Sequence, residues 1–175
     1  MQQTKNSIDL TQIPGEIKRT KTELLAVVSS FPQEKINTVP FAGSWTAGQV
    51  SEHLLKAVGT DLLYGKTKKA DRDPAEKIET LEKIFLDFNT KLTSPDFILP
   101  SNRVQEKEDL LGKLESLWNR IDKAAGELDL DEICLDFEMP GMGTLTRLEW
   151  ICFFICHTRR HIFQLTNIHR KLHAA

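Results

Sequence analysis

The sequence predicts an all-α protein, a helical bundle of the up-and-down type with one long crossing connection. Apolar residues recur at helical spacing through most of the chain, and clusters of proline and glycine separate the periodic segments. The chain has 175 residues, of which 40% are hydrophobic, so it can bury a substantial core. We expect one domain spanning residues 1–175.

The first two helices are predicted on either side of a proline-containing linker. Helical periodicity extends from Leu10 to Phe31, and Pro32 closes that segment. A second helix begins at Thr46, because Gln49 three residues later completes a plausible capping box. His53 lies inside its apolar stripe and should therefore point into the bundle. The stripe consists of Val50, Leu54, Ala57, Val58 and Leu62.

A third and a fourth helix are predicted in the middle of the chain. Asp73 followed by Pro74 is typical of an N-cap with proline at the first helical position. The proline-punctuated stretch 92–102 predicts a loop. Apolar residues at helical spacing then continue from Leu110 to Leu128. The face of the third helix consists of Ile78, Leu81, Phe85 and Phe88.

The last third of the chain predicts a short extended piece, a turn and a long helix. Ile133–Phe137 alternates weakly between apolar and polar residues. Met139–Thr144 contains one proline and two glycines, which favour a turn. The final helix runs from Leu145 to about Leu172. Its segment Trp150–Cys156 is apolar on nearly every side, which indicates that neighbouring helices enclose it.

Composition and charge argue against several classes of protein. The formal net charge of −2 gives no electrostatic case for binding nucleic acid, an acidic partner or a membrane surface. The first twenty residues lack the pattern of a signal peptide, and the longest apolar run is too short to span a bilayer. Three cysteines indicate no disulfide framework and fit a reducing compartment. We therefore expect a cytoplasmic protein.

Two histidines four residues apart, His157 and His161, suggest a metal site on the final helix. That spacing allows both imidazoles to reach one ion. His53 is the third candidate ligand, since it faces inward from another helix. Three protein ligands would leave a position open for water or substrate. Two other interpretations remain: a solvated basic patch with Arg159 and Arg160, or ordinary core histidines.

Residues around the histidines have weaker assignments. Gln49 precedes His53 by one helical turn and Gln164 follows His161 by three residues, so either could hydrogen-bond a ligand from behind. Arg160 could line the pocket and hold an anionic group, or it could face solvent. Nearby Cys152 and Cys156 point away from the histidine pair and are expected to be small core residues. Apart from the candidate ligands, the sequence offers no obvious general base.

The motifs SWTAGQVSEHLLKA at 44–57 and TRLEWICFFICHTRRHIFQL at 146–165 resemble the DinB/YfiT-like superfamily. Members share a Trp-Ser/Thr entry to a helix with one histidine, and a late His-x-x-x-His followed by Gln. The resemblance implies a DinB-like four-helix bundle, often dimeric, with zinc, nickel or a similar divalent ion on His53, His157 and His161. The stretch at 73–100 is then an additional helix or loop segment.

The resemblance also implies possible activities. Some relatives are S-transferases that use bacillithiol, or mycothiol-dependent enzymes, and others are labelled metal-dependent hydrolases. We therefore expect a metal-dependent transfer of a small thiol to a small-molecule electrophile, because a metal-bound thiol is deprotonated without a protein base. The alternatives are metal-dependent hydrolysis, or a non-catalytic bundle that binds or dimerises and keeps a vestigial site.

Overall fold

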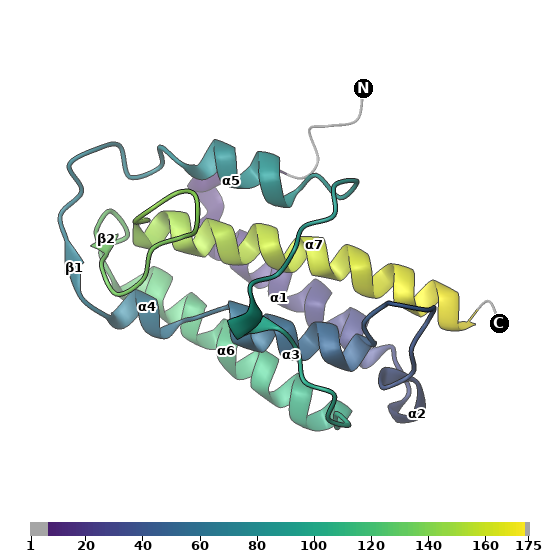
Figure 1. Ribbon diagram of the computed structural model, residues 1–175. Coiled ribbons are helices and arrows are strands. Elements are labelled where there is room, and N and C mark those ends of the chain that lie inside the picture. The colour runs from purple at the N-terminus through teal and green to yellow at the C-terminus, as the bar shows by residue number, and fades with distance from the viewer. Residues whose placement is uncertain (1–6, 174–175) are drawn as a thin grey trace.

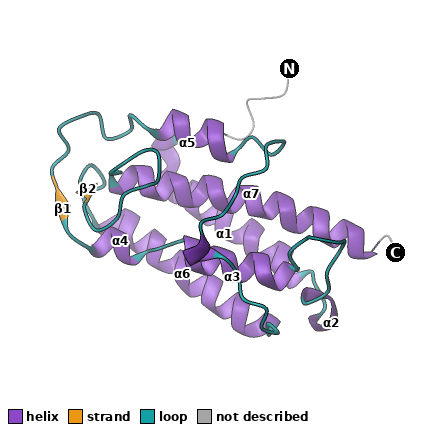
Figure 2. Ribbon diagram, in the orientation of Figure 1, coloured by secondary structure: helices purple, strands orange, loops and turns teal. Residues whose placement is uncertain are grey.

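The computed structural model describes residues 7–173 and contains four long helices packed as a bundle (Figure 1). The prediction of an all-α four-helix bundle is confirmed. Within residues 7–173, strand is confined to two short pieces, which lie together at one end of the molecule (Figure 2). The four bundle helices are α1 (Ile13–Ser29), α3 (Ala47–Ala57), α6 (Lys107–Glu127) and α7 (Arg147–His173).

The bundle contains two pairs of parallel neighbours, α3 with α6 and α1 with α7, whose shared direction follows from the pairs Glu16–Arg159 and Phe31–His169. Helices α1 and α3 each pack against both α6 and α7. Helices α3 and α6 run in the same direction: the start of α3 at Gly48 lies against Gln105, and Asp61 beyond its end is paired with Arg120 at 2.8 Å. Parallel neighbours cannot be joined by a short turn, so the predicted long crossing connection joins α3 to α6.

This connection spans 58–106 and carries several short elements. They are α4 (Asp61–Tyr64), β1 (Thr67–Lys68), α5 (Ile78–Phe85) and the 3-10 helix η2 (Asp96–Ile98). In Figure 1, α5 lies along the outer side of α7, and the chain then crosses back to η2 beside α3. The additional segment predicted at 73–100 therefore lies over the bundle rather than lengthening it.

The remaining short elements are η1 (Leu10–Gln12), α2 (Gln33–Ile36) and β2 (Ile133–Cys134). Strand β2 pairs antiparallel with β1, in the stretch where a short extended piece is predicted. The predicted turn before α7 contains Gly141 and Gly143, whose φ angles of 78° and 72° lie in the left-handed region that favours glycine.

The predicted N-cap at Asp73 is wrong, because α5 begins only at Ile78. The preceding turn is held by Glu149 of α7, which accepts a hydrogen bond from the main-chain N–H of Lys77 at 2.9 Å. Arg72 also reaches Glu149, at 2.6 Å. These contacts fix the backbone at 72–77 before the helix can start, and no local sequence pattern reports them.

The entry to α3 follows the prediction closely. The Thr46 hydroxyl accepts from the Gln49 main-chain N–H at 3.1 Å, and the Gln49 amide oxygen accepts from Thr46 N–H at 3.0 Å. This reciprocal pair is the predicted capping box. It fixes the direction from which α3 begins and so the turn on which His53 lies.

Helix α7 is the most enclosed helix of the bundle. Every residue from 150 to 156 is buried, as predicted from its apolar character on all sides. Its neighbours include α1, α3 and α5, which explains why no polar face is needed there. No helix within residues 7–173 is long and apolar enough to cross a membrane.

Candidate metal centre

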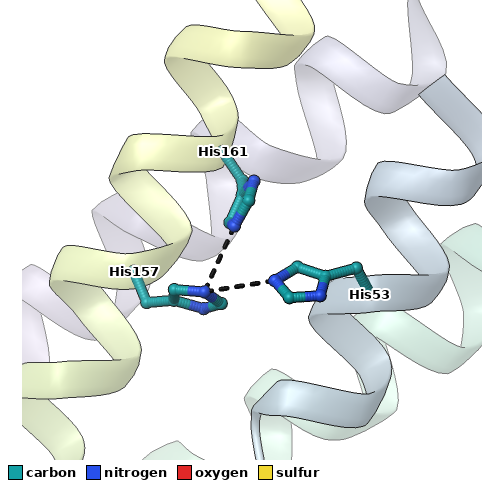
Figure 3. A group of neighbouring side chains, drawn as sticks. All are labelled: His53, His157 and His161. Carbon is teal, nitrogen blue, oxygen red and sulfur yellow. Dashed lines mark hydrogen bonds between the residues drawn. The ribbon is translucent and has the colours of Figure 1, made fainter. Parts of the chain in front are cut away.

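Three histidines from two helices converge on one point inside the bundle (Figure 3). His53 comes from α3, and His157 and His161 come from successive turns of α7. The Nε2 atom of His157 lies 3.2 Å from Nε2 of His53 and 3.2 Å from Nε2 of His161. One ligand nitrogen from each ring lies within 4.8 Å of the other two. All three side chains are buried.

Hydrogen bonds on the far side of two rings determine which nitrogen faces the centre. His53 Nδ1 lies 2.9 Å from the main-chain oxygen of Ile98, which can only accept, so Nδ1 carries the proton. His161 Nδ1 lies 2.7 Å from Oε1 of Gln164. In this orientation of the amide the oxygen accepts, so Nδ1 of His161 also carries the proton. Both rings therefore direct an Nε2 lone pair toward His157.

Burial keeps the three imidazoles neutral near neutral pH. Loss of solvent lowers the pKa of His53, which the hydrogen bond to Ile98 only partly offsets. The pKa of His161 falls to about 3, mainly through burial and then through repulsion from His53. Burial also holds the pKa of His157 well below its usual value. The neutral ring is the form that binds a metal ion.

The donor set fits a divalent cation. Two Nε2 lone pairs face the Nε2 of His157, which can donate one proton at most, so the three rings cannot satisfy one another. His157 Nδ1 is buried and has no hydrogen-bond partner among the residues that the structure describes. A cation could accept a lone pair from all three rings. Imidazole ligands suit zinc and nickel, and three of them leave a further coordination position open.

A cavity of about 550 Å³ lies beside this cluster. His157 and His161 form part of its wall, together with residues from α3, the long connection, the turn before α7 and α7 itself. A cavity of this size is in the usual range for a small-molecule site. Its aromatic lining residues are Phe85, Phe97, Phe137, Trp150 and Phe153.

The polar side chains of the cavity include two cations. Lys56 forms an ion pair with Glu52 at 3.0 Å and donates to the Leu99 carbonyl at 2.8 Å. Arg160 lines the cavity, which is the first of the two positions predicted for it. It donates hydrogen bonds to the main-chain oxygen of Asp87, at 2.7 Å, and to that of Thr90. Among the described residues that line the cavity, none is Asp or Glu.

The two glutamines predicted to support the histidines have different positions. Gln164 contacts His161, as described above. The assignment of Gln49 is wrong: its amide oxygen completes the capping box, and its nitrogen donates to Ser101 O and Asn102 Oδ1 at 3.1 and 3.2 Å. The helix end and the neighbouring loop therefore use both ends of this amide. The ring of His53 is instead held by Ile98.

The neighbouring arginine and cysteines lie outside the cluster. Arg159 is buried and paired with Glu16 of α1. Cys152 and Cys156 are buried free thiols. Burial raises the pKa of the Cys156 thiol to about 12 and that of Cys152 higher still, so neither is a thiolate near neutral pH. Both behave as core residues.

Sequence reasoning missed the contribution of the long connection to the site. The Ile98 carbonyl is a main-chain group, so no residue type could have marked it as a partner of His53. Phe85 and Phe97 could have been found only through their position over the bundle. The proline-rich stretch at 92–102 was the available signal, since a long ordered loop is often functional.

Comparison with known proteins establishes the family. The family model of the DinB superfamily matches residues 16–165, which include all three histidines. The chain belongs to the DinB superfamily. The candidate ligands of this DinB protein lie on α3 and α7, the second and last helices of its bundle.

Individual relatives are distant. The chain is 25% identical over 142 residues to the uncharacterized protein YuaE of Bacillus subtilis, covering 81% of this chain and 88% of that protein. It is 24% identical over 157 residues to a Bacillus cereus protein named "Putative metal-dependent hydrolase", covering 90% and 83%. The solved structure of YfiT from Bacillus subtilis superposes with a TM-score of 0.61 and 16% identity, covering 97% of this chain and 92% of YfiT. YfiT is described as "a probable metal-dependent hydrolase with an unusual four-helix bundle topology", and its likeness supports the fold.

Proposed function

We propose that this DinB protein is an enzyme that depends on a divalent metal ion, zinc or nickel, held by His53, His157 and His161. The observation that carries the proposal is the convergence of three buried Nε2 atoms within 4.8 Å, beside a cavity large enough for a small molecule. Buried polar atoms normally satisfy one another, and these do not. A perturbed, incompletely paired cluster at a cavity is typical of a functional site.

The reaction we propose is transfer of a low-molecular-weight thiol, of the bacillithiol type, to a small electrophile. A bound divalent ion lowers the pKa of a coordinating thiol and so supplies a thiolate near neutral pH. The absence of Asp and Glu among the described lining residues is compatible with this choice, because the transfer needs no protein base. A reducing, cytoplasmic setting suits such a thiol and the three free cysteines.

The residues of this chain have separate tasks in the proposal. The Ile98 carbonyl and the Gln164 amide keep a proton on Nδ1 of His53 and His161, which leaves each Nε2 free to bind. Phe85 and Phe153 pack edge to face at 5.0 Å, and both rings lie against His157, where in this proposal they limit the access of water. Their rings therefore favour attack by the thiol over attack by water.

Metal-dependent hydrolysis is the second candidate function. It is favoured by the printed names of the Bacillus cereus relative and of YfiT, which both refer to metal-dependent hydrolases. The same three histidines would serve, with water in place of the thiol. The two reactions therefore differ in the nucleophile that the cavity admits, a thiol or water.

Metal content tests the site itself. The protein is purified without a histidine tag, loaded with zinc or nickel and desalted. Elemental mass spectrometry should then find about one equivalent of the metal per chain. His157→Ala should hold far less, and His173→Ala, an exposed histidine at the end of the same helix, should match the wild type. Equal metal content in all three proteins would exclude the site.

Turnover separates the two reactions. Loaded protein is incubated with an activated haloarene or an epoxide, with and without bacillithiol, and products are separated by liquid chromatography. The transfer proposal expects a thioether product that requires both the thiol and the ion. An ester substrate cleaved at the same rate with and without thiol would support hydrolysis instead.

A further inference from the structure

The charges around the cavity are unbalanced. Two cationic side chains line it, and no Asp or Glu is found among its described lining residues. The charge of Lys56 is matched by Glu52 at 3.0 Å. Arg160 instead donates to two main-chain carbonyls, and within residues 7–173 no carboxylate forms an ion pair with it. One positive charge at the cavity therefore has only neutral hydrogen-bond partners.

Arg160 keeps donors for a ligand. A guanidinium group has five N–H bonds, and the carbonyls of Asp87 and Thr90 use two of them. The nearest acidic side chain, Asp87, accepts from the Thr90 hydroxyl at 2.5 Å and from Asn89 N–H at 3.1 Å. Its own partners thus hold this carboxylate, and it attracts Arg160 from a distance without forming an ion pair with it.

Arg160 also lies close to the histidine cluster. It precedes His161 by one residue and follows His157 by three. Along the helix axis it therefore lies within one turn, whose length is about 5.4 Å, of each ligand. All three side chains line the same cavity. A small molecule whose anionic end contacts Arg160 would therefore place its body beside the reactive centre.

Another part of the wall is aromatic and continuous, and it begins at His157. Successive ring centroids lie 5.2 Å apart from His157 to Phe153, 5.7 Å from Phe153 to Trp150 and 6.0 Å from Trp150 to Phe137. Phe97 follows Phe137 at 6.0 Å and is 65% exposed, so this wall reaches solvent. Such a surface favours an apolar, flat or extended ligand body.

We infer that the electrophilic substrate of this site is a small molecule with an apolar body and a carboxylate group. This inference rests on the proposed function. The carboxylate is held by Arg160, whose planar fork matches two carboxylate oxygens. The apolar body lies along the wall formed by Phe153, Trp150 and Phe137. Arg160 is thus the residue that selects charged acids over neutral molecules of the same shape.

A matched pair of ligands tests the inference on the wild-type chain. Phenylbutyrate and its primary amide have nearly the same shape and differ in charge. Isothermal titration calorimetry is performed near neutral pH on the full chain stripped of metal, so that the carboxylate cannot bind an ion instead. The acid should bind about tenfold more tightly than the amide, as expected for a charge-assisted pair. Equal affinities would overturn the inference.

Variants identify the residue responsible. Arg160→Gln should lower the affinity for the acid about tenfold, to that of the amide, and leave the amide unchanged. Lys56→Gln is the matched comparison at the same cavity, and it should change the preference by less than about threefold because Glu52 already compensates this charge. A preference for the acid that survives Arg160→Gln, or that Lys56→Gln removes equally, contradicts the assignment.

The outcome is separate from that of the proposed function. The titrations contain neither metal nor thiol, so a preference for the acid that depends on Arg160 supports the inference even if no turnover is found. Conversely, a chain that transfers thiols with no preference between acids and amides keeps its enzymatic role and loses this substrate class.

Discussion

Two buried polar clusters connect α7 to other parts of the chain, and they differ in how completely they are satisfied. At the start of α7, Glu149 is fully buried. One of its carboxylate oxygens accepts from Arg72 at 2.7 Å and from Lys77 N–H at 2.9 Å. The other accepts from Arg72 at 2.6 Å and from Thr146 N–H at 2.9 Å. The Glu149 cluster is closed, with every acceptor used.

The histidine cluster is also buried but is not closed. His53 and His161 both present a lone pair to His157, which has one proton to give. Complete pairing is typical of a cluster that holds the fold together, and incomplete pairing of one that needs another partner. The comparison therefore separates a structural role at Glu149 from a binding role at the histidines.

The largest effect should follow from breaking the closed cluster. Glu149→Ala leaves the guanidinium of Arg72 without its carboxylate, and we expect a loss of about 3 kcal/mol in the free energy of unfolding. Denaturant unfolding followed by circular dichroism measures the change. Glu79→Ala, which removes an exposed pair with Lys83, is the control and should cost less than about 1 kcal/mol. A loss at Glu149 as small as that at Glu79 would contradict the structural role.

Removing the metal should have the next largest effect, and only through the open cluster. An ion present at a hundred times its dissociation constant stabilises the folded chain by about 2.7 kcal/mol. A chelator should therefore lower the melting temperature of the loaded wild type. His53→Ala should melt at one temperature with and without chelator. A chelator response that persists in this variant would mean that the ion binds elsewhere.

The partner behind His161 should tune the affinity for the ion. Gln164→Ala removes the acceptor for the Nδ1 proton, and loss of such a partner weakens metal binding by roughly 10- to 100-fold. Competition with a chromophoric chelator gives the dissociation constant. An affinity within twofold of the wild type would show that Gln164 does not orient this ring.

The smallest effect is expected at Gln49, which stabilises the fold and has no contact with the cluster. Gln49→Ala removes half of the capping box and should cost about 1 kcal/mol of stability or less. The metal dissociation constant should remain that of the wild type in the same chelator assay. A change in that constant as large as the one at Gln164 would reverse the roles of the two glutamines.

The parts of the fold and site that follow local rules could be predicted from the sequence. The capping box at Thr46 and the apolar periodicity after it place His53 on an inward face, and the spacing of His157 and His161 places both on one side of α7. Convergence of the three rings then requires only that two helices pack together. The case of Gln49 shows the limit, since two predicted roles competed for one amide and the local cap prevailed.

The remaining features depend on contacts between distant segments. Arg72 meets Glu149 across 77 positions, and His53 meets the Ile98 carbonyl across 45. Neither pair has a periodic signature, and a main-chain carbonyl has no signature in residue type at all. The same reason explains the misplaced start of α5, which depends on Glu149 and not on its own first turn.

The parallel packing of α3 and α6 means that ion-binding residues and many cavity-lining residues lie on different parts of the chain. Because these neighbours need a long return, the bundle carries the segment 58–106, which also contributes Leu63, Ile78 and Leu81 to the buried core. The histidines lie on the bundle helices, whereas Phe85, Phe97 and Ser94 in the cavity wall lie on the return. Replacement of Phe85 or Phe97 could thus alter what the cavity accepts, whereas the Ile98 carbonyl, which holds the ring of His53, ties the return to the ion-binding scaffold. In engineering terms, substrate choice can be redesigned at the lining side chains of the return as long as its contacts to His53 and Glu149 are kept.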